Sequence, residues 1–188
     1  MGIETIINKR RNIKPELFSG AVIPDGDIQA LLEAANWAPT HGHTEPWRFH
    51  IFSKESMQVF LDAYREVLGQ IESEQERIIS LMQVWELRAK LSSHIIVVAM
   101  KRGDNPKIPV WEEIAAVGAA VQNMWLLATE RNIAMYWGSG GLTAQPLFKE
   151  AFGYGEQDLM MGFLILGRYE GEWPEGKRKS DISAKTDW

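Results

Sequence analysis

Segments with the periodicity of a helix alternate along this chain with short apolar runs of the length of a strand. In residues 27–36 and 112–131, apolar side chains recur every three or four positions, as on one face of a helix. Trp47, Phe49 and Ile51 instead alternate with polar neighbours, which is typical of a half-buried strand. Short apolar runs predict three more strands, at residues 95–100, 133–137 and 161–166. This alternation predicts one sheet covered by helices, either parallel and doubly wound or in an α+β arrangement.

The remaining segments complete this outline. Short helices are expected at residues 3–10 and 146–152. Residues 54–91 are helical in character, with a polar interruption at residues 69–77. The last residues, 171–188, are polar and rich in Gly and Pro, which predicts an irregular tail.

Composition limits the class of protein. A chain of 188 residues with 45% apolar content suits a single domain, residues 1–188, with a substantial core. The net charge of −5 argues against general nucleic-acid binding, which needs a basic surface. The absence of cysteine excludes disulfides, thiolate zinc sites and cysteine nucleophiles. Neither a signal-peptide pattern nor an apolar run of membrane length is found, so we expect a cytoplasmic protein without a membrane partner.

Two patterns in the sequence do not complete a known binding motif. Residues 137–143 contain glycines after a strand, but Thr143 occupies the place of the third glycine of a dinucleotide-binding fingerprint. His41 and His43 form a His-x-His pair with few other histidines to complete a ligand set, so no metal site is expected.

Three segments carry candidate binding chemistry, and each has an ordinary structural alternative. Residues 9–11 are basic, which suits either a solvated helix end or a phosphate clamp. The loop at residues 38–46 lies between two tryptophans that could cover a planar ring, or it simply joins a helix to a strand. Small residues at 138–141 would let backbone N–H groups approach a ligand, or would form a tight turn.

The order of these segments resembles the nitroreductase family of FMN enzymes, in particular its small members, from Ile6 to about Lys179. The matching motifs are Arg-Arg at 10–11, Ala-Pro-Thr at 38–40 with Pro-Trp at 46–47, Gly-Ala-Ala at 118–120, Trp-Gly-Ser-Gly-Gly at 137–141, Gly-Phe-Leu-Ile-Leu-Gly at 162–167 and Lys-Arg at 177–178. The resemblance implies an α+β nitroreductase-like fold, with a mostly antiparallel sheet flanked by helices, in an intertwined homodimer that holds FMN at the subunit interface.

The resemblance also assigns site residues. Arg10 and Arg11 would hold the FMN phosphate, and Asn12 would contact the ribityl chain or the ring. Trp37 and His41 would reach the FMN of the other subunit. The rest of the implied cofactor contacts are Trp137, Gly138 and Ser139 along the isoalloxazine, and Arg178 as a second phosphate contact.

The function implied is an FMN-dependent oxidoreductase. NAD(P)H would reduce the flavin, and a nitroaromatic, quinone or similar electron-poor acceptor would then be reduced in a ping-pong cycle. No side chain is assigned as catalytic, although His41 and His43 are candidate donors near the flavin.

The chain departs from the family pattern at four positions: Asn12 replaces a common Ser, His43 an Asn, Glu45 a Gln, and Gly138 a larger basic residue of close relatives. The changes put substrate preference in doubt. Alternatives are a non-catalytic FMN-binding or redox-sensing dimer, flavin fragmentation or reductive dehalogenation on the same fold, and a scaffold without flavin.

Overall fold

A single antiparallel sheet forms the centre of the molecule. The computed structural model describes residues 2–188, with all of their side chains except those of Leu142 and Ala144; Met1, the first residue of the expected domain, lies outside this range. The strand order is β1 (Trp47–Phe52), β2 (His94–Met100), β4 (Leu159–Gly167) and β3 (Ala134–Gly138). Every pair of neighbouring strands is antiparallel. This decides between the two arrangements that the pattern allowed and confirms the α+β, nitroreductase-like prediction.

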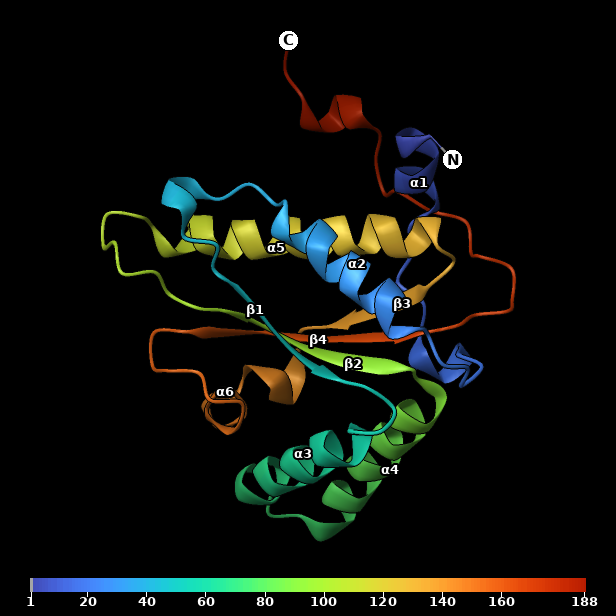
Figure 1. The fold of residues 1–188 in the computed structure, drawn as a ribbon, viewed down its shortest axis with the longest axis vertical. Coiled ribbons are helices and arrows are strands. Elements are labelled where there is room, and N and C mark those ends of the chain that lie inside the picture. The colour runs from blue at the N-terminus through green and yellow to red at the C-terminus, as the bar shows by residue number, and fades with distance from the viewer. Residues whose placement is uncertain (1) are drawn as a thin grey trace.

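Two long helices cover one face of the sheet. These are α2 (Asp25–Asn36) and α5 (Val110–Glu130), with the short α1 (Ile3–Lys9) beside α5 (Figure 1). Their buried residues pack with the strand residues that point the same way, among them Ile96, Val98 and Leu164. Burial of this apolar area is the main stabilising contribution to the layer.

The helices α3 (Met57–Ile71), α4 (Gln75–Leu91) and α6 (Pro146–Ala151) cover the opposite face (Figure 1). Their core is aromatic: Phe60 lies 5.3 Å from the rings of both Trp85 and Phe163, centroid to centroid. The polar stretch expected at residues 69–77 interrupts the helical segment only at residues 72–74, because the chain turns there from α3 into α4.

The apolar and polar side chains that alternate along β1 are not alternately buried and exposed over its whole length. Trp47 is buried as expected, but Ile51 remains 37% exposed and Phe52 is buried on the opposite face. The reason is position: β1 is at the edge of the sheet, and Phe52 packs against Phe60 of α3.

Four short 3₁₀ turns connect these elements: η1 (Pro15–Leu17), η2 (His41–His43), η3 (Gly141–Ala144) and η4 (Ile182–Lys185). After β4 the chain is irregular, as predicted, and its last residues extend beyond α5 (Figure 1). Within the described residues, no helix has both the length and the apolar character needed to cross a bilayer.

Candidate functional site

The basic residues at the end of α1 lie beside β3. Asn12 forms a parallel β-bridge with Met135, and the N–H of Ile13 donates to the Met135 carbonyl at 3.1 Å. The Oδ1 atom of Asn12 accepts a hydrogen bond from the N–H of Trp137 at 3.0 Å. The segment 10–12 is therefore attached to the strand that leads into the glycine turn at residues 138–141.

Three arginines gather at this end of the sheet. The guanidinium of Arg10 lies 4.7 Å from the centroid of the Trp125 ring, and Arg11 Nε donates to the Pro174 carbonyl at 2.8 Å. Partial burial lowers the pKa of Arg10, and the positive charges of Arg11 and Arg178 lower it further. Among residues 2–188, none of the three forms an ion pair with a carboxylate. An uncompensated cluster of guanidinium groups is suited to binding an anion such as a phosphate.

A hollow of about 700 Å³ adjoins β3 on its α4 side. Trp137, Gly138 and Ser139, which the sequence had assigned together, all line it. The volume is within the range of roughly 300–1,000 Å³ typical of small-molecule and cofactor sites.

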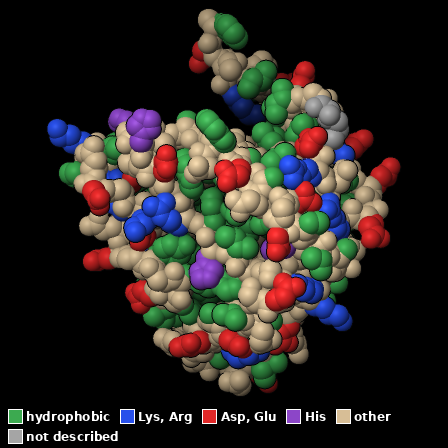
Figure 2. All heavy atoms as spheres, viewed as in Figure 1, with side chains coloured by type: hydrophobic (Ala, Val, Ile, Leu, Met, Phe, Trp, Pro, Cys, Tyr) green, Lys and Arg blue, Asp and Glu red, His purple; other side chains and the backbone are tan. Residues whose placement is uncertain are grey.

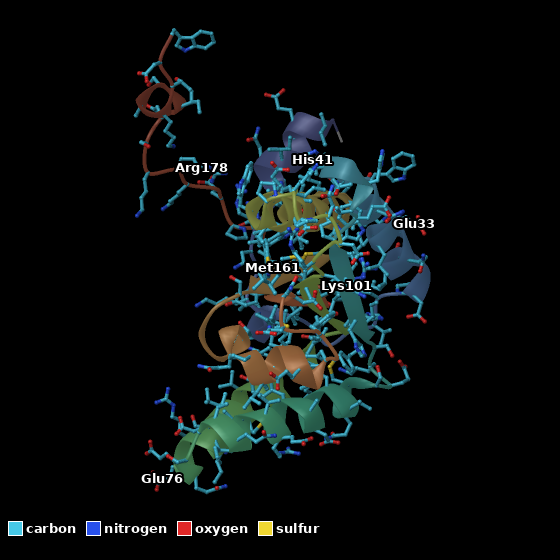
Figure 3. The ribbon with its side chains drawn as sticks, turned by 90° about the vertical axis from the view of Figure 1, so that its left-hand side faces the viewer. Glu33, His41, Glu76, Lys101, Met161 and Arg178 are labelled. Atoms are coloured by element: carbon cyan, nitrogen blue, oxygen red, sulfur yellow. The ribbon has the colours of Figure 1, made fainter. Side chains whose placement is uncertain are left out.

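Close backbone contacts shape one wall of this hollow. Gly162 of β4 has a φ of +111°, and a Cβ there would overlap the carbonyl oxygen of Gly138. The indole Nε1 of Trp137 donates to the carbonyl of Met161, a residue labelled in Figure 3, at 2.9 Å. A Cβ on Gly138 would lie 3.2 Å from the Tyr136 ring, so a larger residue at position 138 would crowd that ring.

The hollow also includes residues that the sequence reasoning missed. On the strand and turn these are Tyr136 and Thr143, beside Gly140 and Gly141 of the predicted glycine turn; on α4 they include Arg77, Trp85 and Arg88. Arg88 donates to Glu16 Oε1 at 2.8 Å, and its guanidinium lies near the rings of both Trp85 and Tyr136. Trp85 and Arg88 are three positions apart, the spacing that places two side chains on one helix face, and this was the available signal.

Trp37 and His41 belong to a different part of the surface. Trp37 is 86% exposed at the end of α2 and borders a hollow between α1, α2 and α5. His41 lies in η2, on the α5 side of the sheet, and its Nδ1 is 2.6 Å from Glu112 Oε2 (Figure 3). Neither lines the hollow beside β3, so one chain does not bring all the predicted contacts together.

Comparisons with known proteins identify the family of the chain. The model of the family described as "Nitroreductase family" matches residues 7–168. An Escherichia coli K12 protein named "Putative NAD(P)H nitroreductase YdjA" is 34% identical over 166 residues, 88% of this chain and 86% of YdjA. The crystal structure of a nitroreductase-like family protein from Bacillus cereus has a TM-score of 0.85 at 29% identity, over 100% of this chain and 96% of that one.

A more distant structure has the same fold. It comes from Desulfovibrio desulfuricans and is described as a "putative nitroreductase in complex with fmn"; its TM-score is 0.73 at 19% identity, over 99% of this chain and 95% of that one. At this identity the likeness supports the architecture. Together with the family model and the 34% identical relative, it leads to one conclusion: the chain belongs to the nitroreductase family.

Proposed function

We propose that this chain is an FMN-dependent NAD(P)H oxidoreductase, with residues 1–188 forming one FMN-binding domain that works as an intertwined homodimer. Electron-poor acceptors such as nitroaromatics and quinones are the proposed substrates. The name of YdjA describes a putative NAD(P)H nitroreductase, and the structure of the Desulfovibrio desulfuricans protein was determined in complex with FMN. Both support the same pair, FMN and NAD(P)H, for this chain.

One observation carries the proposal. Arg10 and Arg11 precede Asn12, which is bound to the strand beside an aromatic hollow. Within residues 2–188, Arg10, Arg11 and the nearby Arg178 form no ion pair with a carboxylate. Asn12 connects Arg10 and Arg11 to the hollow through its hydrogen bond to the Trp137 N–H. FMN has the matching shape, with a phosphate at one end and a flat ring at the other. Arg10, Arg11 and Arg178 would hold the phosphate, and Asn12, Trp137, Gly138 and Ser139 would contact the ribityl chain and the ring.

The roles of the chain's own residues follow from this fit. FMN supplies the redox chemistry by taking a hydride from NAD(P)H and passing it to the acceptor. The arginines bind the phosphate by charge-assisted hydrogen bonds. The glycine turn allows close approach of backbone N–H groups, and Trp137, fixed by its bond to Met161, closes one side. We assign no catalytic acid or base to this hollow.

The proposed homodimer accounts for the exposed apolar side chains on the α5 side of the sheet. They include Ile3, Ile7 and Trp37. Figure 2 shows hydrophobic side chains gathered in the middle of the face on which α2 and β1 lie. Among the described residues, no atom outside the backbone of α5 itself lies within 4 Å of a Cβ built at Gly118, so packing within one chain does not account for this glycine. In the dimer, a partner helix would pack at this position, and the partner subunit's Trp37 and the partner subunit's His41 would complete the flavin site.

FMN binding is tested directly. The purified protein should be yellow, and added FMN at 100 times its dissociation constant should stabilise it by about 2.7 kcal/mol. Arg10→Ala should weaken FMN binding about 10- to 100-fold, because it removes a charged contact to the phosphate. Lys90→Ala removes an exposed charge at the end of α4 and should leave binding unchanged. Unchanged thermal stability on addition of FMN would refute the proposal.

Reduction of the flavin by a nicotinamide distinguishes the proposed enzyme from its main alternative, a non-catalytic FMN-binding protein. Anaerobic NADH or NADPH should bleach the flavin absorbance, and a quinone should restore it. A protein that binds FMN but is bleached by neither nicotinamide would be the non-catalytic FMN-binding or redox-sensing dimer instead.

The assembly is tested by light scattering of the full chain, which should give the mass of a dimer. Gly118→Arg places a long charged side chain at the proposed helix contact and should produce monomers. A monomeric wild-type protein would exclude the shared site.

A further inference from the structure

His41 and Glu112 form a close pair that the proposed flavin contacts do not explain. Nδ1 of His41 lies 2.6 Å from Oε2 of Glu112, and the two side chains are 63% and 26% exposed. A carboxylate can only accept, so Nδ1 carries the proton and donates it to Glu112. Nε2 is then the free atom of the imidazole, and no hydrogen bond to it is found within residues 2–188.

The loop that carries His41 has a defined backbone. Gly42, His43 and Glu45 all have positive φ values, of 59°, 53° and 42°. Thr40 Oγ1 accepts from the N–H of Glu45 at 3.2 Å and lies 2.9 Å from Thr44 Oγ1. Left-handed conformations of residues other than glycine are costly and persist only when the surroundings hold them. These contacts hold the backbone of the loop that carries His41.

The pair borders a hollow of about 430 Å³ at the start of α5. Its walls are the exposed ring of Trp111 on one side and Pro39 and Thr40 on another, and three alanines of α5 also line it. A flat, partly polar molecule suits such a combination of an aromatic wall and a histidine.

We propose that Glu112 is a positioning residue, which holds His41 so that Nε2 acts as the hydrogen-bonding and proton-delivering atom for the electron acceptor. This inference rests on the proposed function, since His41 serves the flavin site of the partner subunit. Trp111 forms the aromatic wall beside which a quinone or nitroaromatic ring would lie.

The proton balance of the reaction gives His41 a defined task. Reduction of a quinone to a hydroquinone takes two electrons and two protons. FMN, when bound in its reduced form, would supply both electrons and one proton as a hydride. The second proton passes to the quinone oxygen from Nε2 of protonated His41, which recovers a proton from water through its exposed side.

The first test is structural and does not depend on activity. In the FMN-loaded wild-type dimer, long-range ¹⁵N–¹H NMR should show neutral His41 protonated at Nδ1, with His41→Gln identifying the signal. Glu112→Ala should move the proton to Nε2, whereas Glu112→Gln, whose amide oxygen still accepts, should keep it on Nδ1.

The second test separates the two half-reactions by anaerobic stopped-flow. With 1,4-benzoquinone as the acceptor, flavin reoxidation should slow about tenfold in Glu112→Ala and at least tenfold in His41→Gln, and its pH dependence should flatten. In Glu112→Ala, FMN retention and reduction by NAD(P)H should stay within about twofold of wild type, and Glu112→Gln should restore most of the reoxidation rate.

Glu76→Ala is the control, because Glu76 is likewise a glutamate in the first turn of a helix, is exposed and lies at the opposite end of the molecule (Figure 3). It should change neither readout. Equal reoxidation rates and pH profiles in wild type and Glu112→Ala, an unchanged tautomer, or loss of FMN from Glu112→Ala would overturn the inference while leaving the proposed function standing. A wild-type protein that does not bind FMN or is not reduced by NAD(P)H would instead refute the proposed function.

Discussion

The side-chain oxygen of Asn12 accepts a hydrogen bond from the backbone N–H of Trp137, with the two atoms 3.0 Å apart. This bond fixes the distance between the arginines before Asn12 and the glycine turn after Trp137.

Replacement of Asn12 should therefore affect both stability and cofactor binding. Asn12→Ala removes the acceptor and should lower the free energy of unfolding by about 0.5–1.5 kcal/mol, measured by urea denaturation without FMN. Asn12→Asp keeps an acceptor but adds a negative charge beside the proposed phosphate site. It should retain the stability and still weaken FMN binding about tenfold, measured by fluorescence titration. Tight FMN binding by Asn12→Asp would remove position 12 from the phosphate end of the site.

Gly162 should be irreplaceable for a steric reason. Its φ of +111° is unfavourable for other residues, and a Cβ would collide with the Gly138 carbonyl. Gly162→Ala should lower the free energy of unfolding by about 2–4 kcal/mol, since the β3–β4 junction must shift. Gly69→Ala should have the opposite effect on the free energy of unfolding. Gly69 is in α3 with open space around it, so alanine should stabilise the protein by up to about 1 kcal/mol. Equal effects of the two substitutions in thermal unfolding would contradict this account.

The helices and strands were predictable because each depends on local pattern. The stripe of α5, from Val117 to Ala128, follows from spacing alone, and the helix is observed at Val110–Glu130. The direction of the strands was not available from periodicity, because long helical segments between strands suit both parallel and antiparallel sheets. The resemblance to a family supplied this information, and the pairing of β2 with both β1 and β4 confirms it.

The site was predictable only where its residues are close in sequence. Trp137, Gly138 and Ser139 line one hollow, as expected for neighbours on a strand end. The spacing of Trp85 and Arg88 places them on one helix face, but they were missed because α4 meets β3 only through the tertiary fold. Glu112 was missed for the same reason: its partner His41 is 71 residues away.

Asp27 should be a stabilising residue that connects three elements. Its carboxylate lies 2.7 Å from Arg131 Nη1 and 3.4 Å from Arg168 Nη2, and all three side chains are about two-thirds buried. Asp27→Asn should lower the free energy of unfolding by about 1–2 kcal/mol, between the values for exposed and buried pairs. The control is Asp62→Asn, which breaks an exposed pair with Arg65 and should cost less than about 0.5 kcal/mol. Urea denaturation at low and high salt measures both, and indistinguishable costs would show that the Asp27 network is no stronger than a surface pair.

His94 should make the stability of the fold depend on pH. Its side chain is only 2% exposed, its Nδ1 lies 2.9 Å from Ser93 Oγ, and its Nε2 lies 3.4 Å from Asp25 Oδ1. Burial lowers the pKa of His94, and the nearby carboxylates of Asp25 and Glu55 oppose this only in part. The folded protein therefore favours the neutral imidazole more strongly than the unfolded chain does.

The sign of the effect follows from proton linkage. Below the unfolded-state pKa of about 6.5, the unfolded chain binds the proton more readily than the folded protein. The contribution of His94 is thus complete above that pH and is lost as the pH falls toward the lowered folded pKa, at up to about 1.4 kcal/mol per pH unit. Urea denaturation at pH 8, 7, 6 and 5 should show this loss in the wild type and a smaller slope in His94→Gln. His43→Asn removes an exposed histidine at a left-handed position that asparagine accepts, and it should keep the wild-type slope. An equal slope in His94→Gln and wild type would assign the acid sensitivity to the carboxylates instead.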